Sequence, residues 1–237
     1  MAIRGIFVMF ARSSIVLAAL LVLAARPADA QELKVDLELV LAIDSSDSVD
    51  GGEFALQVKG LADAFRQADI HHAILGLPRR SIAVTVVEWA SVNQQVIQLP
   101  WTVIDSPEAA VQVADRISAI NRSFERGLTS ISALIDAAAR MFDDNGFDGD
   151  RRVVDISSDG RQNDGRPIEL SRAFALLERI TINALTILTD YEHLDRYYRE
   201  SVIGGTGAFV EVTNDFPSYP KAIHRKLMRE ISDVPIS

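Results

Sequence analysis

Residues 35–48 read VDLELVLAIDSSDS, and they indicate the class of the fold. The run from Val35 to Ile43 is mostly apolar, and it ends abruptly in a polar segment that begins at Asp44. A short, nearly continuous apolar run is typical of a strand that is buried on both faces of a sheet. Apolar residues then recur at helical spacing from Phe54 to Phe65, so a helix is expected to follow the strand.

The same alternation of strand and helix continues along the chain. We expect further strands at residues 81–90, 94–99, 152–157, 181–188 and 207–212, and helices at residues 107–120, 130–142, 167–179, 191–202 and 219–231. The strand at 94–99 should stop at Pro100, and Ser106 should cap the helix that begins at Pro107. This order indicates an α/β fold with a doubly wound, mostly parallel sheet flanked by helices. No linker or repeat divides it, which predicts one domain over residues 33–233.

The first thirty residues have the pattern of a cleaved secretory signal. Arg4 and Arg12 precede an apolar run from Ile15 to Ala25, and the small residues Ala28 and Ala30 suit signal peptidase, with cleavage near Ala30. The run is shorter than the roughly 20 apolar residues that a membrane-spanning helix needs. We therefore expect residues 1–30 to be a signal peptide, the protein to be periplasmic or secreted, and no integral membrane segment to remain after cleavage.

Charge and cysteine content exclude several classes of function. The formal net charge is −9, and removal of residues 1–30 takes away three arginines and one aspartate and leaves −11. A nucleic-acid partner is not expected, because phosphate binding depends on clustered Lys and Arg. The chain has no cysteine, which excludes disulfides, zinc-thiolate sites and thiol nucleophiles.

Three polar segments follow predicted strands or open a predicted helix. They are Asp44-x-Ser46-x-Ser48 after the first strand, Thr129 at a helix start, and Asp159 just past the strand at 152–157. Ligands of open parallel sheets gather at the carboxyl ends of the strands. All these side chains offer oxygen, the ligand atom that suits Mg²⁺, Mn²⁺ or Ca²⁺. If the backbone stays extended, the side chains of residues 44, 46 and 48 point the same way. Two of these are neutral hydroxyls, which reduce the charge of the metal less than carboxylates do, so the bound ion would stay electrophilic.

Together these segments resemble a known family. DSSDS at 44–48, GLTS at 127–130 and SDG at 158–160 are similar to the three segments of the metal-ion-dependent adhesion site of von Willebrand factor A and integrin inserted domains. VVEWAS at 86–91 resembles the second strand of that family, and VIGGTGAFVEV at 202–212 resembles the turn into its last strand. The set VEW, QLPWT, GDRRV, ILTD and VIGG also looks like a bacterial branch of exported proteins.

The resemblance implies a site and a mode of binding. Its metal set would be Asp44, Ser46, Ser48, Thr129 and Asp159, holding Mg²⁺, with Mn²⁺ or Ca²⁺ as alternatives. Ser46 and Ser48 would coordinate directly, Asp44 and Asp159 directly or through water, and Thr129 would depend on the ligand state. An acidic side chain of a protein partner would complete the coordination. The family fold also implies one short antiparallel edge strand. Asp47 and Ser158 depart from the usual residues, but neither removes a ligand.

Plainer interpretations stay open. The three segments read separately are a capped turn, a helix cap and a loop. The acidic segment 143–150 lacks the glutamate of a calcium loop, so a solvated acidic turn is expected there. Glu88 lies between apolar neighbours and is assigned no chemistry. Two rival functions are a metal-assisted hydrolase at the same site and a metal-independent scaffold subunit. We do not expect an enzyme, because no His or Lys lies near the motifs to act as a base.

Overall fold

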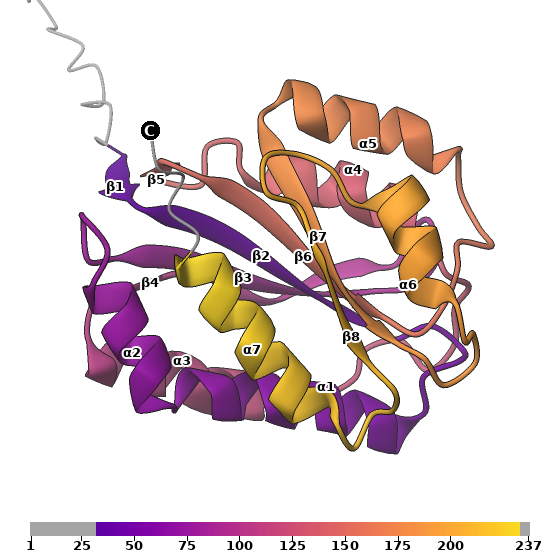
Figure 1. Ribbon diagram of the computed structural model, residues 1–237, viewed down its shortest axis with the longest axis horizontal. Coiled ribbons are helices and arrows are strands. Elements are labelled where there is room, and N and C mark those ends of the chain that lie inside the picture. The colour runs from indigo at the N-terminus through magenta and orange to yellow at the C-terminus, as the bar shows by residue number, and fades with distance from the viewer. Residues whose placement is uncertain (1–31, 233–237) are drawn as a thin grey trace, which may run out of the picture. The chain divides into compact units, whose positions relative to one another are not determined.

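A single six-stranded sheet forms the centre of the protein. The computed structural model describes residues 32–232. Its strands follow the order β4-β3-β2-β6-β7-β8, and all neighbours are parallel except β3 and β4 (Figure 1). This confirms the predicted α/β fold with a mostly parallel sheet. The strands are β2 (Leu37–Asp44), β3 (Ile82–Trp89), β4 (Gln95–Ile104), β6 (Arg152–Ser158), β7 (Ile180–Ile187) and β8 (Val210–Thr213).

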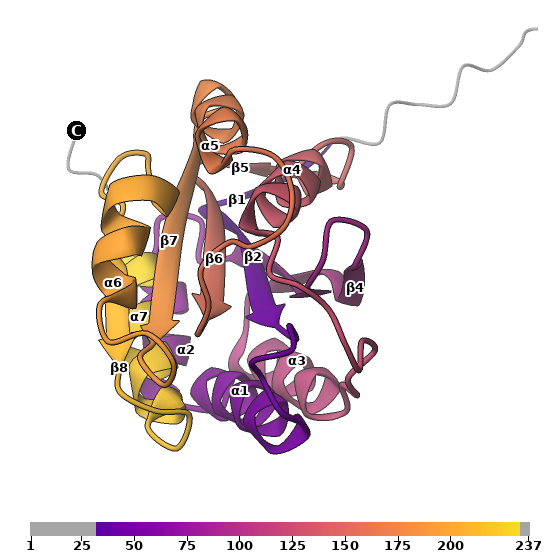
Figure 2. The ribbon, with the colours of Figure 1, turned by 90° about the vertical axis from the view of Figure 1, so that its right-hand side faces the viewer.

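Helices cover both faces of this sheet (Figures 1 and 2). One face carries α1 (Gly51–Phe65), α2 (Ala68–Leu75), α3 (Pro107–Ser118) and α7 (Tyr219–Ser232), which pack on one another. The other face carries α4 (Ile131–Met141), α5 (Ile168–Leu177), α6 (Leu194–Tyr197) and the π-helix η1 (Tyr198–Val202). As predicted, Ser106 caps α3, because its hydroxyl accepts a 3.2 Å hydrogen bond from the backbone N–H of Ala109.

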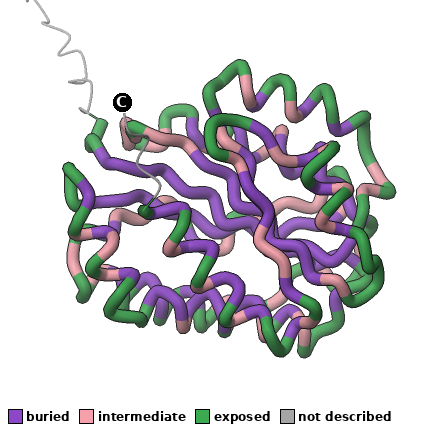
Figure 3. Tube along the Cα trace, viewed as in Figure 1, coloured by how far each residue is buried: buried purple, intermediate pink, exposed green. Residues whose placement is uncertain are grey.

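The core lies in two layers, one on each face of the sheet. Along β2, Leu37, Leu39, Leu41 and Ile43 pack toward the layer of α1 and α7, whereas the alternate residue Val40 packs toward α4. Every residue of β2 is buried, and Figure 3 shows the buried strands running through the centre of the trace. Each fully buried side chain of this kind contributes about 1.5–3 kcal/mol. The apolar run therefore fixes β2 as a central strand.

The antiparallel edge strand β4 is longer than predicted. The expectation that it stops at Pro100 is wrong, because the strand continues to Ile104. Pro100 is tolerated because β4 pairs only with β3, and the pairing is irregular between Val84 and Val86, next to the proline. Beyond it, Trp101 donates a 2.8 Å hydrogen bond from Nε1 to the backbone carbonyl of Met141.

Three elements were not predicted from the sequence. They are α2, β1 (Leu33–Val35) and β5 (Phe147–Gly149), and the two strands pair in a small parallel sheet. The expected solvated turn at 143–150 is therefore wrong in part, since β5 occupies three of its residues. Buried Glu38 holds this segment, because its Oε1 accepts a 2.7 Å hydrogen bond from the N–H of Gly149.

The predicted signal peptide at residues 1–30 lies outside the described residues. Within residues 32–232, no helix is long and apolar enough to cross a membrane.

Candidate metal centre

Two neighbouring strands deliver the two aspartates of the site to the same edge of the sheet. Asp44 is the last residue of β2, and Asp159 directly follows β6. These strands pair in parallel, with Ile43 opposite Ser157. The chain builds the sheet outward from β2 in both directions, first to β3 and later to β6, so the site lies where the strand order reverses. This is the position at which open α/β sheets usually bind ligands.

Hydrogen bonds join four of the five predicted residues. The N–H of Ser46 donates to Oδ1 of Asp44 at 2.7 Å, and the hydroxyls of Ser46 and Ser48 lie 3.3 Å apart. The hydroxyl of Ser48 donates to Oδ1 of Asp159 at 2.7 Å. Ser158 closes the group from the other side, because its hydroxyl donates to Oδ2 of Asp44 at 2.6 Å. The structure therefore brings Asp44, Ser46, Ser48 and Asp159 together.

Thr129 lies beside this group, next to Gly160. A Cβ at Gly160 would lie 3.3 Å from Oγ1 of Thr129 and 3.8 Å from Oγ of Ser48, so both hydroxyls surround the glycine. Asn163 fixes the backbone of Thr129: its Oδ1 accepts from the N–H of Thr129 at 2.7 Å, and its own N–H donates to the carbonyl of Thr129 at 3.0 Å. All five predicted residues thus meet at one place, and Asn163 positions one of them.

The loop of residues 44–48 is held by a side chain that the sequence did not reveal. The guanidinium of Arg122 donates to the backbone carbonyls of Ser45 at 2.8 Å, Ser46 at 3.3 Å and Val49 at 2.7 Å. Arg122 lies in an irregular segment with no motif around it, so only the folded chain shows which carbonyls it reaches. Its planar fork fixes the loop that carries two of the candidate hydroxyl ligands.

Asp47, which differs from the residue usual at this position in the family that the sequence resembles, also has a structural role. Its backbone N–H donates to the carbonyl of Gly127 at 2.8 Å, and its Oδ1 accepts from the N–H of Gly127 at 2.9 Å. These two bonds tie the loop of residues 44–48 to the segment that carries Thr129. A carboxylate at this position therefore aligns two parts of the site.

Glu88 is fully buried at the end of β3, and it anchors the segment of Arg122. Its carboxylate accepts hydrogen bonds from the N–H of Ser123 at 2.8 and 2.9 Å and from the N–H of Phe124 at 3.0 Å. The side-chain amide of Gln98 donates to it as well. Both oxygens are occupied by structural donors, so the geometry gives Glu88 a positioning role and not that of a general base. In the sequence, the only sign of this role was the presence of an acidic residue between Val87 and Trp89.

The two aspartates are buried close together and repel each other. Burial raises the pKa of Asp44. Burial and the negative charge of Asp44 together raise the pKa of Asp159 to about 7, although the hydrogen bond from Ser48 acts in the opposite direction. Oδ2 of Asp159 is buried and has no hydrogen-bond partner among the described residues. A buried, unpartnered carboxylate oxygen costs free energy unless a cation or a proton satisfies it.

The donor set fits a hard divalent cation. It combines two carboxylates with three hydroxyls, and the residues that carry them are buried except for Ser48, which is exposed. Within residues 32–232 no three or more His, Cys, Asp or Glu residues form a metal-binding group, so coordination here would depend on the hydroxyls. Oxygen ligands of this kind suit Mg²⁺, Mn²⁺ or Ca²⁺ better than softer metals.

A family model covers almost the whole described chain. Residues 34–235 match the family described as "Protein of unknown function (DUF1194)". The chain belongs to this family. A comparison with curated proteins finds no match.

Solved structures identify the fold of this DUF1194 member. Proximal thread matrix protein 1 from the mussel byssus matches with a TM-score of 0.63 and 13% identity, over 86% of this chain and 48% of the mussel chain. A structure of the same mussel protein, described as having a zinc-occupied MIDAS motif, matches with a TM-score of 0.59 and 16% identity, over 86% and 50% of the two chains. The pilus adhesin SpaC of Lactobacillus rhamnosus GG matches with a TM-score of 0.56 and 11% identity, over 85% and 30%.

These likenesses show the von Willebrand factor A fold. The chain spans about half the length of the mussel protein chains that it matches.

Proposed function

We propose that this chain is an exported, divalent-metal-dependent protein-binding module of the adhesion type. It holds Mg²⁺ through Asp44, Ser46, Ser48, Thr129 and Asp159, and an acidic side chain of its partner completes the coordination. The observation that carries the proposal is Oδ2 of Asp159, which is buried beside a second buried carboxylate and has no hydrogen-bond partner within residues 32–232. A divalent cation would neutralise both charges and give this oxygen a ligand to bind.

The choice of metal follows from the donor atoms. The mussel structure with a zinc-occupied MIDAS motif supports a divalent ion at such a site in this fold. Zinc in proteins is usually held by nitrogen or sulfur ligands, whereas this set offers oxygen alone. Mg²⁺ is therefore our first choice, with Mn²⁺ and Ca²⁺ as alternatives. When bound, the ion would act as a Lewis acid that attracts a carboxylate from outside.

The rim of the site suits a protein partner. Leu128, next to Thr129, is 49% exposed, and Val92 is 39% exposed. The N–H of Leu128 donates to the hydroxyl of Ser91 at 2.7 Å, so the loops that carry the two apolar residues are joined. Apolar residues around the metal would add buried surface to an interface whose one strong ionic contact is the carboxylate on the metal.

Export rests on the sequence of residues 1–30, which fits a cleaved signal. No second function is favoured by an observation. The hydrolase alternative needs a base near a metal-bound water, and Glu88, the marginal candidate, has both oxygens engaged by backbone and amide donors.

Metal binding can be tested by thermal unfolding of the purified chain with and without Mg²⁺. We expect Mg²⁺ to raise the Tm of the wild type, because a ligand stabilises the state that it binds. The variant Asp159→Asn should lose this response. Asp190→Asn is the matched control, because Asp190 acts on Asp159 only through its charge. If Mg²⁺ raises the Tm of Asp159→Asn as much as that of the wild type, the metal does not bind at this site.

Partner binding can be tested by affinity capture. The immobilised chain is incubated with an envelope extract in Mg²⁺ and then washed with chelator. A second column that carries the variant Asp44→Asn is treated in the same way. We expect proteins that stay on the wild-type column in Mg²⁺, leave with chelator and do not bind the variant. Retention that survives chelation on both columns would instead support a metal-independent scaffold.

A further inference from the structure

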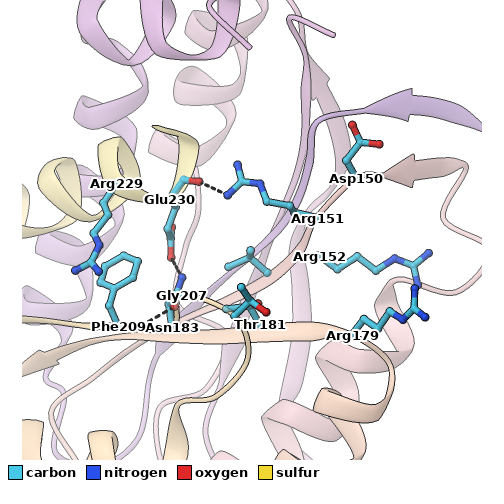
Figure 4. A pocket seen from close by; sticks show the side chains of 12 residues that line it. Asp150, Arg151, Arg152, Arg179, Thr181, Asn183, Gly207, Phe209, Arg229 and Glu230 are labelled. Atoms are coloured by element: carbon cyan, nitrogen blue, oxygen red, sulfur yellow. Dashed lines mark hydrogen bonds between the residues drawn. The ribbon is translucent and has the colours of Figure 1, made fainter. Parts of the chain in front are cut away.

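A basic pocket lies at the amino ends of β6 and β7, at the opposite edge of the sheet from the metal centre. It has a volume of about 510 Å³ (Figure 4). Four arginines line it, against the two carboxylates of Asp150 and Glu230. The chain as a whole has a net charge of −9, so this gathering of positive charge runs against its composition. Because β6 runs from Arg152 to Ser158, the pocket lies about 20 Å from the metal centre.

Two of the four arginines build the wall of the pocket. Arg151 donates to the backbone carbonyls of Glu230 at 2.8 Å and Ile231 at 3.3 Å, which holds the last turn of α7 (Figure 4). The guanidinium of Arg229 stacks on Phe209, 3.8 Å from the ring centroid. These contacts fix α7 and the start of β8 around the cavity, so the other two arginines, Arg152 and Arg179, are the candidates for contact with a ligand.

Arg152 begins β6, Arg179 directly precedes the neighbouring strand β7, and both line the pocket. Figure 4 shows their side chains extending in the same direction, with the guanidinium groups toward each other. Nε of Arg152 lies 3.6 Å from the buried carboxylate of Glu38. No carboxylate within residues 32–232 forms an ion pair with Arg179. Glu38 can offset only one of these two positive charges, so an anion between the two guanidinium groups would be favourable.

The backbone of Arg179 is strained as well. Its φ is +58°, in the left-handed region, one residue past Glu178, the C-cap of α5. Helices usually end with glycine at this point, because a side chain is strained there. The arginine keeps a strained backbone where glycine would avoid the strain, a pattern found at ligand-binding sites.

We propose that this pocket binds a phosphate dianion between Arg152 and Arg179, either as inorganic phosphate or as the phosphate of a monoester. Guanidinium groups donate paired N–H bonds to phosphate oxygens. The lining residues carry an excess of two positive charges, one of which faces Glu38, and a phosphate monoester above its second pKa of about 6 supplies up to two negative charges. A Cβ at Gly207 would meet no atom within 4 Å, so its backbone is open to a ligand. The volume leaves room for the rest of a small monoester.

The test is calorimetric titration of inorganic phosphate into the chain at constant ionic strength, pH 7.5, with EDTA present. Arg179→Gly removes the guanidinium and the strain together, so it should unfold no earlier than the wild type yet bind phosphate at least tenfold more weakly. Arg80→Gly is a matched control, because Arg80 has a φ of +60° but does not line the pocket. We expect it to bind phosphate like the wild type.

The outcomes decide both the ligand and the site. Tighter binding of glycerol 3-phosphate than of phosphate would assign a monoester, and equal or weaker binding would assign the free ion. The proposal is overturned if Arg179→Gly binds phosphate like the wild type, if the wild type shows no phosphate binding over a chloride blank, or if succinate binds more tightly than phosphate. EDTA removes divalent ions, and Asp159→Asn should bind phosphate normally, so failure here is separate from failure of the metal proposal.

Discussion

The hydroxyl of Ser48 donates a 2.7 Å hydrogen bond to the carboxylate of Asp159, across a separation of 111 residues. This contact exists because β2 and β6 are parallel neighbours whose carboxyl ends reach the same edge of the sheet. It satisfies Oδ1 of Asp159 and leaves Oδ2 buried without a partner among the described residues. The same contact therefore helps to assemble the candidate site, in which one buried carboxylate oxygen has no donor among the described residues.

The metal-free protein should lose stability as the pH rises from about 4 to about 7. The pKa of Asp159 is raised from 3.8 to about 7, mainly by burial. In this window the folded state binds a proton that the unfolded state has released, so the free energy of unfolding falls by about 1.4 kcal/mol per pH unit for one such group. Urea denaturation in EDTA at pH 5, 6 and 7 measures this slope.

Mg²⁺ should reduce that slope, because the cation satisfies the ionised carboxylate and removes the advantage of the proton. Asp155 has a pKa raised to about 7 as well, by burial and by the charge of Glu230, so part of the slope should remain in Mg²⁺. Asp159→Asn should show the smaller slope even in EDTA. A slope in EDTA that is the same in the wild type and in this variant would contradict the prediction.

Replacement of Arg122 by lysine should weaken Mg²⁺ binding about tenfold without unfolding the protein, as substitutions of residues that position metal ligands commonly do. Lysine keeps the charge but lacks the planar fork that reaches the carbonyls of Ser45, Ser46 and Val49. Calorimetric titration of Mg²⁺ measures the affinity. Arg116→Lys is the control, since Arg116 donates to the hydroxyl of Thr102 and not to the loop of residues 44–48. Equal affinities in the two variants would show that Arg122 does not position the site.

Replacement of Lys226 by methionine should destabilise the protein by about 3–5 kcal/mol, because it leaves buried carboxylates without their cation. Lys226 is fully buried on α7, with Nζ 2.5 Å from both Asp155 on β6 and Glu230. The loss should grow as the pH rises above about 7, where Asp155 must ionise. Urea denaturation of this variant and of the double variant Lys226→Met/Asp155→Asn checks the cause, since the double variant should recover part of the loss. A double variant that is no more stable would show that charge is not the reason.

The sequence predicted those parts of the fold that depend on local patterns. Continuous apolar runs identified β2, β3 and β6, because strands buried on both faces need them. The five candidate site residues could be named because each follows a strand or opens a helix in a motif of fixed spacing. The antiparallel edge strand was expected too, but its length was not, because the cost of Pro100 depends on whether a second strand pairs with β4.

What the sequence could not predict depends on contacts between distant residues. Nothing near Arg122 indicates that it reaches the loop of residues 44–48, and the pairing of β1 with β5 joins segments more than a hundred residues apart. Glu88 was noticed as unusual, but its donors, the N–H groups of Ser123 and Phe124, belong to an irregular segment. Such contacts follow from the fold and not from spacing.

The most direct test of the metal centre is a crystal structure of the chain grown with Mn²⁺, with anomalous scattering used to locate the ion. We predict a single strong peak at the edge of the sheet between Asp44 and Asp159, within direct coordination distance of the hydroxyls of Ser46 and Ser48. A crystal with no peak at this position, although Mn²⁺ is bound elsewhere on the chain, would contradict the account.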